Sequence, residues 1–168
     1  KKDKIIKTLL SSGTSGSVPS KIYLDGENSK NQTWVLSKII GSVLGKKRIP
    51  MLVVDQNPSR SNRYNFSARI AAINGFSIFG KNITYLIDSN NKLNINVLNK
   101  FLSLYGNSNF LIFGFTSVVY QHLLQNKISK KIKHNLKNGI LIHGGGWKKL
   151  EEISITNKMF KDLLLKKY

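Results

Sequence analysis

The strongest constraint on the fold is an alternation of short apolar runs with longer amphipathic stretches. The short runs are continuous, as in buried parallel strands, and the longer stretches repeat their apolar residues at helical spacing. The predicted strands are 51–54, 83–87, 110–115 and 139–142, and the predicted helices are 34–44, 66–73, 97–105, 118–128 and 157–167. A strand followed by a helix, repeated four times, predicts an α/β fold with a mostly parallel sheet flanked by helices.

Two apolar runs near the start of the chain, Ile5–Leu10 and Ile22–Leu24, predict a pair of strands around a turn. Asp25 follows directly and is of a type that caps the N-terminus of a helix. Gly75 and Gly106 are expected to end the helices before them, because glycine is common just past a helix C-terminus. Neither a repeat nor an internal boundary interrupts the pattern, so we expect a single domain.

Length and composition set the broad class of protein. A chain of 168 residues with 40% hydrophobic residues is long enough and apolar enough for a core. No apolar run approaches the roughly 18 residues of a membrane span, so we expect none. The start of the chain has no initiator methionine and no signal-peptide pattern, and we expect a piece of a longer chain. The absence of cysteine excludes disulfides and thiolate metal sites here and fits the cytoplasm.

The formal net charge of +19 admits a nucleic acid or another polyanion as partner. Only four of the 27 basic residues are arginine, however, and arginine is preferred for bidentate contacts to phosphate and guanine. Lysine, asparagine and isoleucine are all abundant and all have A/T-rich codons, so genome composition accounts for the excess. Nucleic acid is therefore not the expected partner. A basic α/β module that binds a polyanion without chemistry stays as the alternative.

A loop rich in glycine and hydroxyl side chains lies between the first two predicted strands. Its members are Ser11, Ser12, Gly13, Thr14, Ser15, Gly16 and Ser17, and Lys21 closes it. Glycines let backbone N–H groups turn toward an anion, hydroxyls add donors and the lysine adds positive charge, so the loop is a candidate polyphosphate site. A Gly/Ser linker is the alternative, although linkers rarely have strands so close on both sides.

Ligands of parallel α/β sheets bind beyond the carboxyl ends of the strands, and three predicted strands end in informative sequence. Asp55 follows the first of them and suits a ribose, a metal or a backbone turn. At the second, Gly114 permits the close approach of a ligand. Thr116 and Ser117 come next and either cap the following helix or face a pocket.

The third strand exit reads His143-Gly144-Gly145-Gly146-Trp147. Three consecutive glycines lose much conformational entropy on folding and offer no side chain for packing. Such a run indicates that bare backbone is needed, for example beneath a flat ring; a tight turn from strand to helix is the alternative. His143 is a candidate general base, with hydrogen bonding or packing as the other role.

Together these segments resemble the acyl-protein synthetase (LuxE-type) family, a branch of the adenylate-forming superfamily that includes acyl-CoA synthetases and phenylacetate-CoA ligase. The resemblance runs over nearly the whole chain and is carried by Ser-Gly-Thr-Ser-Gly at 12–16 with a downstream proline and lysine, Gly-Phe-Thr at 114–116, and His-Gly-Gly-Gly-Trp-Lys at 143–148. It implies that residues 1–168 are the central nucleotide-binding portion of the large N-terminal domain of such an enzyme, truncated at both ends.

The resemblance also implies an activity and a site. ATP, with Mg²⁺, activates a carboxylic and in particular a fatty acid as acyl-adenylate, and the acyl group passes to a protein thiol on a reductase or carrier protein. Residues 11–17 and Lys21 would hold the β- and γ-phosphates. Gly144, Gly145 and Gly146 would offer backbone to the adenine, flanked by His143 and Trp147. Phe113, Gly114, Phe115 and Thr116 would line the route of the acid, and both phenylalanines also suit a core.

Lys21 and His143 are the candidate catalytic residues, and no residue of the chain is assigned to a metal. In one respect the chain departs from the superfamily pattern, because Ser20 separates Pro19 from Lys21, where the lysine usually follows the proline directly. The adenine- and magnesium-binding Tyr-Gly-x-x-Glu segment of the superfamily is not within the sequence, so we expect little turnover by these 168 residues alone. A nucleotide-binding interaction subunit without catalysis is a third possibility.

Overall fold

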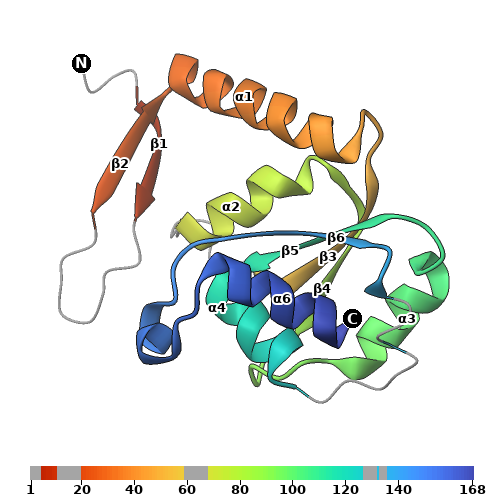
Figure 1. The fold of residues 1–168 in the computed structure, drawn as a ribbon. Helices are drawn as coiled ribbons and strands as arrows, with labels where there is room; N and C mark the ends of the chain where they lie inside the picture. Colours follow the sequence, from red (N-terminus) through yellow and green to blue (C-terminus); the bar gives the residue numbers. More distant parts are fainter. Residues whose placement is uncertain (1–4, 11–19, 59–67, 127–131, 133–135) are drawn as a thin grey trace. The chain divides into compact units, whose positions relative to one another are not determined.

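A computed structural model describes residues 5–10, 20–58, 68–126, 132 and 136–168 of the chain (Figure 1). The chain divides into two compact units, which we describe separately. One unit contains residues 1–48 and 58–79, and the other, called the sheet unit below, contains residues 49–57 and 80–168. The expectation of a single domain stays a prediction.

The first unit combines a strand pair with two helices. Strand β1 (Ile5–Leu10) pairs antiparallel with β2 (Lys21–Asp25), which confirms the predicted strand pair. Helix α1 (Gly26–Leu44) follows at once because the Asp25 side chain accepts a hydrogen bond from the backbone N–H of Asn28 at 2.8 Å, as an N-cap does. Helix α2 spans Ala68–Ser77.

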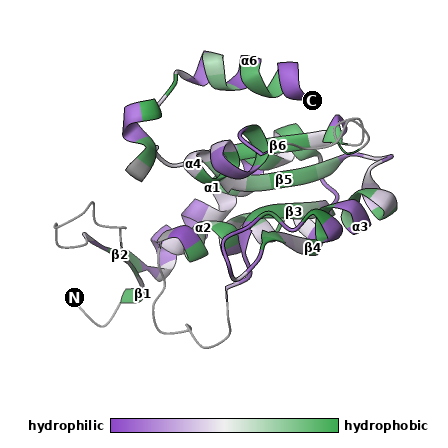
Figure 2. Ribbon diagram, turned by 90° about the horizontal axis from the view of Figure 1, so that it is seen from below, coloured by the Kyte–Doolittle hydropathy of each residue, from purple (hydrophilic) through white to green (hydrophobic). Residues whose placement is uncertain are grey.

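The sheet unit is built on four parallel strands: β3 (Ile49–Gln56), β4 (Gly80–Ile87), β5 (Phe110–Phe115) and β6 (Gly139–Gly144). Their order is β4-β3-β5-β6, and every neighbouring pair is parallel. Figure 2 shows these strands as predominantly hydrophobic, as expected for a sheet buried on both faces. The predicted α/β class with a mostly parallel sheet is therefore confirmed.

One face of this sheet carries the main apolar core of the unit. The strands contribute Leu52, Val54, Leu86, Phe110 and Ile112, and the covering segments contribute Leu98, Phe101, Val119, Leu123 and Phe160. The covering helices are α3 (Ile95–Tyr105), α4 (Thr116–Val119), which continues directly as the π-helical turn η3 (Tyr120–Leu124), and α6 (Asn157–Lys167). The 3₁₀ segment η4 (Lys148–Ile153) lies between β6 and α6 in the sequence. Within the described ranges, no helix combines the length and apolar character needed to cross a membrane.

Register brings the carboxyl ends of the strands to one edge of the sheet. Val54 of β3 pairs with Gly114 of β5, which pairs in turn with His143 of β6. The chain enters the sheet at β3, adds β4 on one side and then β5 on the other, so the strand order reverses between β3 and β5. Ligands of open α/β sheets bind beside such a reversal, beyond the carboxyl ends of the strands.

Several helix boundaries differ from the sequence-based expectation. Helix α1 begins at Gly26, well before Trp34, because its polar first half lacks the apolar spacing on which the prediction relied. Helix α2 runs through Gly75 to Ser77, so the expected stop at Gly75 was wrong; Gly106, by contrast, caps α3 as predicted. The single helix predicted from residue 118 is instead α4 joined to the π-helical turn η3.

The end of helix α6 is tied to the end of η3 by side chains. The ammonium group of Lys167 donates to the backbone carbonyls of Leu124 and Asn126, and the Tyr168 hydroxyl donates to the carbonyl of Leu123 at 2.6 Å. These carbonyls lie at a helix C-terminus, where backbone acceptors lack partners within the helix. Burial strongly raises the pKa of Tyr168, so its hydroxyl keeps the donated proton at ordinary pH.

Candidate functional site

The centre of the candidate site is the hydroxyl of Thr116, the first residue of α4. Its Oγ1 lies 3.0 Å from Nδ1 of His143, 3.2 Å from the carbonyl oxygen of Gly144 and 3.1 Å from that of Gly145. The N-cap of α4 is Phe115, with no side-chain cap. Of the two roles open to Thr116, the structure therefore supports the pocket role: Thr116 connects the ends of β5 and β6 and does not cap the helix.

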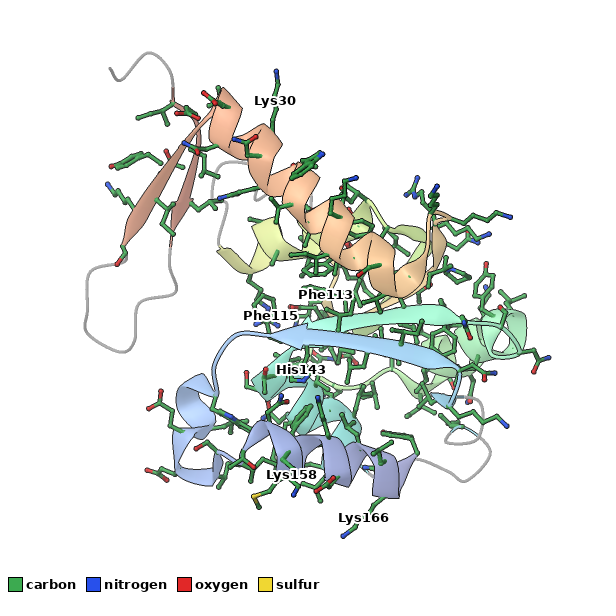
Figure 3. All side chains as sticks on the ribbon, turned by 45° about the horizontal axis from the view of Figure 1, so that its top comes forward. Lys30, Phe113, Phe115, His143, Lys158 and Lys166 are labelled. Atoms are coloured by element: carbon green, nitrogen blue, oxygen red, sulfur yellow. The ribbon has the colours of Figure 1, made fainter. Side chains whose placement is uncertain are left out.

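His143 lies on the face of β6 that is covered by α6, as Figure 3 shows. Its ring packs on Phe160 of α6, with ring centroids 4.6 Å apart and planes inclined by 41°. The pKa of His143 lies below its ordinary value. Burial is the larger cause, and the positive charge of Lys161 is the second. At neutral pH the imidazole is therefore uncharged.

Aromatic side chains form one wall of the site. Trp147 packs edge-on against Tyr120 of η3, with centroids 5.0 Å apart, and against Phe160 at 6.1 Å. Beside these rings lies a pocket of about 380 Å³, within the size range of small-molecule sites. It is lined by Thr116, His143, Gly144, Gly145, Trp147, Ile155, Asn157, Phe160 and Lys161. We call it the glycine pocket.

The three consecutive glycines are not equivalent. Gly145 has a φ of +80°, and a Cβ there would lie 2.8 Å from Cδ1 of Phe115, so both conformation and packing require glycine. A Cβ on Gly144 or Gly146 would meet no described atom within 4 Å. The fold thus accounts for one glycine and leaves two exposed backbone positions beside the pocket, where a ligand can approach closely.

The residues predicted to line the route of the acid are divided between the two faces of the sheet. Phe113 and Phe115 lie on the same side of β5, with centroids 6.1 Å apart, and face away from His143 (Figure 3). Phe113 is only 3% exposed, so it is a core residue. A Cβ on Gly114 would lie 2.7 Å from Cγ2 of Val119 and 3.0 Å from Cβ of Val54. Close packing explains why residue 114 is a glycine. The predicted role of Gly114 in letting a ligand approach stays a prediction.

Asp55 is buried near the end of β3, with 5% of its surface exposed. Its Oδ1 accepts a hydrogen bond from the backbone N–H of the next residue, Gln56, at 2.7 Å, and its role toward a ribose, a metal or a turn stays a prediction. Burial, and then the charge of Asp55, raise the pKa of Tyr85 on the neighbouring strand. Among the described residues, no group of three or more histidine, aspartate and glutamate side chains is placed to hold a metal ion.

The predicted phosphate loop lies outside the described residues, except for its closing end. Residues 11–17 are not described, whereas Lys21 is an exposed residue of β2 and pairs with Leu10 of β1. Phosphate binding by Ser11, Ser12, Gly13, Thr14, Ser15, Gly16, Ser17 and Lys21 therefore stays a prediction. The same holds for a catalytic role of Lys21.

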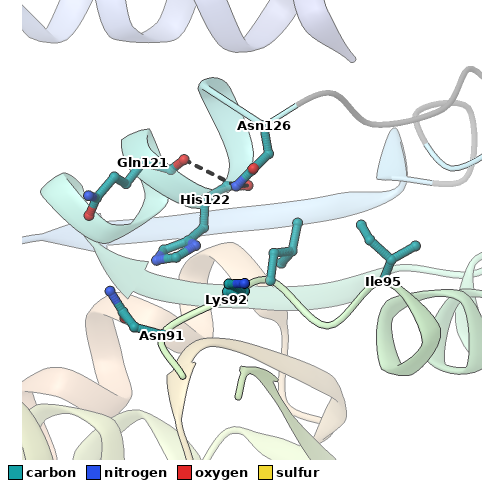
Figure 4. A pocket seen from close by; sticks show the side chains of 7 residues that line it. Asn91, Lys92, Ile95, Gln121, His122 and Asn126 are labelled. Carbon is teal, nitrogen blue, oxygen red and sulfur yellow. Dashed lines mark hydrogen bonds between the residues drawn. The ribbon is translucent and has the colours of Figure 1, made fainter. Parts of the chain in front are cut away.

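A second pocket, of about 500 Å³, opens elsewhere on the sheet unit (Figure 4). It is lined by Asn91, Lys92, Leu93, Ile95, Gln121, His122 and Asn126. The Asn126 side chain closes one side by donating to the carbonyls of Gln121 and His122, at 3.3 and 3.1 Å. Among the predicted site residues that the structure describes, none lines this pocket.

Sequence reasoning missed the contribution of α6 to the glycine pocket. Asn157, Phe160 and Lys161 come from that helix and follow the glycine run by more than ten residues. Their only signal in the sequence was the amphipathic spacing of residues 157–167, which predicts that one helix face is buried but not against what. The exit of β6 therefore predicted four of the nine lining residues, and Thr116 after β5 is a fifth.

The fold and the site together define a parallel α/β protein with a glycine-rich pocket at the carboxyl edge of its sheet. The family model for acyl-protein synthetase, LuxE, matches residues 1–168, the whole chain, and the chain belongs to that family. Membership classes it with the acyl-protein synthetases, a group of ligases. No curated protein and no solved structure matches the chain in the corresponding comparisons.

Proposed function

We propose that this protein activates a carboxylic acid with ATP as an acyl-adenylate and transfers the acyl group to a protein thiol. Family membership supports acyl-protein synthetase activity in general. The observation that carries the nucleotide part is the pair of open backbone positions, Gly144 and Gly146, beside a pocket walled by aromatic rings. A flat base stacks on such a surface, and bare backbone lets it come close.

The proposed reaction has two steps that balance without a redox partner. In the first, a carboxylate oxygen attacks the α-phosphorus of ATP, a new P–O bond forms, and the bond to the β-phosphate breaks to release pyrophosphate. In the second, a protein thiolate attacks the acyl carbonyl and AMP leaves. The first step needs no nucleophile from the protein, so positioning and neutralisation of the phosphate charge are what the site must supply.

Each part of the chain has a proposed role in that reaction. The glycine run and Trp147 would hold the adenine, with His143 at its edge, and residues 11–17 with Lys21 would hold the β- and γ-phosphates. Mg²⁺ bound to the phosphates would neutralise part of their charge; phosphate oxygens and water commonly supply most of its ligands. Lys161 lines the glycine pocket and adds positive charge there, which suits an anionic nucleotide.

The proposed class of acid substrate and the proposed acyl acceptor rest on the family resemblance alone. An apolar, fatty acid is proposed, with an acyl-accepting reductase or carrier protein as partner. The sheet unit offers an apolar cavity of about 460 Å³ lined by Leu123, Leu136, Leu141 and Leu164 among others, but none of the residues predicted for the acid route lines it. The cavity therefore does not decide the chemistry of the acid.

Exchange of labelled pyrophosphate into ATP tests the proposal directly. The full-length protein is incubated with ATP, Mg²⁺ and a panel of carboxylic acids of increasing chain length. We expect exchange that depends on an acid and is lost in Gly144→Val, where a branched side chain would occupy open space at a residue that lines the pocket. Gly41→Ala, at another open glycine in helix α1, is the matched control and should retain exchange. No exchange with any acid would refute adenylate formation.

A polyanion-binding role makes a different prediction. The exposed lysines include Lys30 on α1 and Lys158 and Lys166 on α6, so the charge is distributed over both units (Figure 3). Binding to DNA or RNA through such charges would fall steeply with salt and would ignore changes in the glycine run. At 0.3 M salt the screening length is roughly 6 Å. Nucleotide binding that persists at this salt concentration and is lost in Gly144→Val favours the enzyme.

A further inference from the structure

The hydrogen bonds around Thr116 determine which nitrogen of His143 carries the proton. A hydroxyl has one proton to donate, and the carbonyl oxygens of Gly144 and Gly145 can only accept. The Thr116 proton is therefore used by a carbonyl, and its oxygen remains as an acceptor for the third neighbour. That neighbour is Nδ1 of His143, at 3.0 Å, and all three contacts are satisfied at once only when Nδ1 donates. In the neutral ring the other nitrogen, Nε2, then has a free lone pair.

The surroundings of His143 keep this arrangement at neutral pH. The charged group facing the ring from α6 is Lys161, whose positive charge acts with burial to disfavour a second proton. From α4 the ring meets the neutral hydroxyl of Thr116, and Phe160 and Trp147 complete the wall without charge. The described residues that line the glycine pocket include no carboxylate. His143 lines the glycine pocket, and with Nδ1 engaged by Thr116 the ring nitrogen left as a hydrogen-bond acceptor is Nε2.

A hydrogen-bond acceptor in the glycine pocket can distinguish purines that carry an amino group at C6 from purines that carry a carbonyl oxygen there. Adenine has an exocyclic amino group at C6, which donates, whereas hypoxanthine and guanine have a carbonyl oxygen there, which accepts. We propose that Nε2 of His143 accepts a hydrogen bond from the 6-amino group of adenine, and that Thr116 is a positioning residue that fixes the tautomer required for this selection. The inference rests on the proposed function, because it assumes that the glycine pocket receives the base.

The tautomer can be tested without any ligand. Long-range ¹H–¹⁵N correlation spectra distinguish a protonated from an unprotonated ring nitrogen, and His143→Gln identifies the signals among the three histidines of the chain. We expect Nδ1 protonated and Nε2 unprotonated at pH 7.5 in the wild type and in Thr116→Ser, which keeps the hydroxyl. In Thr116→Val, which lacks it, the proton should move in part to Nε2. A wild-type signal for Nε2–H would overturn the inference.

Selectivity is tested with two nucleotides that share the same triphosphate. Calorimetry of the full-length protein with ATP and with ITP should show that ATP binds roughly tenfold or more tightly, because a carbonyl facing the Nε2 lone pair leaves two acceptors unpaired. Thr116→Val should bring the ratio close to one while Thr116→Ser preserves it. Lowering the pH enough to protonate His143 turns Nε2 into a donor and should reduce the preference for ATP.

The outcomes separate the two proposals. Equal binding of ATP and ITP by the wild type would overturn the selection by His143 and leave nucleotide binding intact. A ratio that is unchanged in Thr116→Val would overturn the role of Thr116 and of the fixed tautomer. Binding of neither nucleotide by the full-length protein would overturn the inference together with the proposed function.

Discussion

Gly145 packs directly on Phe115: a Cβ at residue 145 would lie 2.8 Å from Cδ1 of the ring, and the backbone φ of +80° already disfavours any other residue. The contact joins the exits of β5 and β6, the two strands whose ends form the glycine pocket. It makes Gly145 a structural residue, whereas Gly144 and Gly146 are not constrained in this way.

Gly145→Ala should therefore destabilise the protein by about 1–3 kcal/mol, the range for a residue held in an unfavourable backbone conformation. Gly144→Ala is the matched control, since it lies next in the chain and has open space around it. Urea denaturation followed by tryptophan fluorescence measures both. Equal stability of the two variants would contradict the assigned contact.

Substitutions at Gly144 and Gly146 are expected to affect nucleotide binding and not stability. Gly144→Val and Gly146→Val should leave the free energy of unfolding in urea within about 0.5 kcal/mol of the wild-type value, as for most exposed substitutions. Both should nevertheless weaken ATP binding, because their side chains would occupy the open backbone positions proposed to contact the adenine. Isothermal calorimetry with ATP checks this, with Gly41→Ala as the control. Wild-type affinity in both variants would remove the glycine run from the site.

Gly114 and Val119 should be energetically coupled. A Cβ on Gly114 would come within 2.7 Å of Cγ2 of Val119, so Gly114→Ala is expected to cost about 1–3 kcal/mol through overpacking. Adding Val119→Ala removes that methyl group and should return part of the loss, so the double variant is less destabilised than the sum of the single variants. A double-mutant cycle in urea measures the coupling, and strictly additive free energies would argue against it.

Lys161 should control the titration of His143. Burial and the charge of Lys161 lower the pKa of His143 from its ordinary 6.5, so the unfolded chain binds more protons, and the folded state loses stability as the pH falls below that value. Lys161→Met removes one cause, so the pKa of His143 should rise and the loss of stability in acid should be smaller. An NMR titration of the His143 Cε1–H resonance measures the change.

The control for that titration is Lys158→Met, which removes an exposed lysine from the same helix. It should leave the pKa of His143 close to the wild-type value. A pKa that does not move in Lys161→Met, or that moves equally in both variants, would show that burial alone sets it.

The fold was predictable where one physical signal dominated. The strand 110–115 and the helix 157–167 agree with β5 and α6 in both bounds, because a continuous apolar run and a regular apolar spacing identify them. Asp25 was identified as the N-cap of α1, but the polar residues after it hid the first two turns of the helix. The π-helical turn η3 had no signal, because it arises from packing and not from local propensity.

The site was predictable only as far as single strand exits reveal it. The glycine run and Thr116 were identified, but their hydrogen bonds join residues 28 and 29 positions apart and depend on the pairing of β5 with β6. Phe160 and Lys161 were missed because the apolar pattern of a helix does not indicate its partner. Phe113 was assigned to the acid route by resemblance; its burial fits the core role that was left open beside it, and its part in the acid route stays a prediction.

The hydrogen bonds of Lys167 and Tyr168 to the end of η3 fix the C-terminal end of helix α6 in place. Phe160, which lines the glycine pocket, lies eight residues before Tyr168, or roughly 12 Å along the helix axis. A rigid helix fixed at its far end does not let its near end move alone. A displacement of Phe160 by an occupant would therefore also act on the carbonyls bonded at the end of η3, so contacts outside the pocket contribute to the stiffness of its wall.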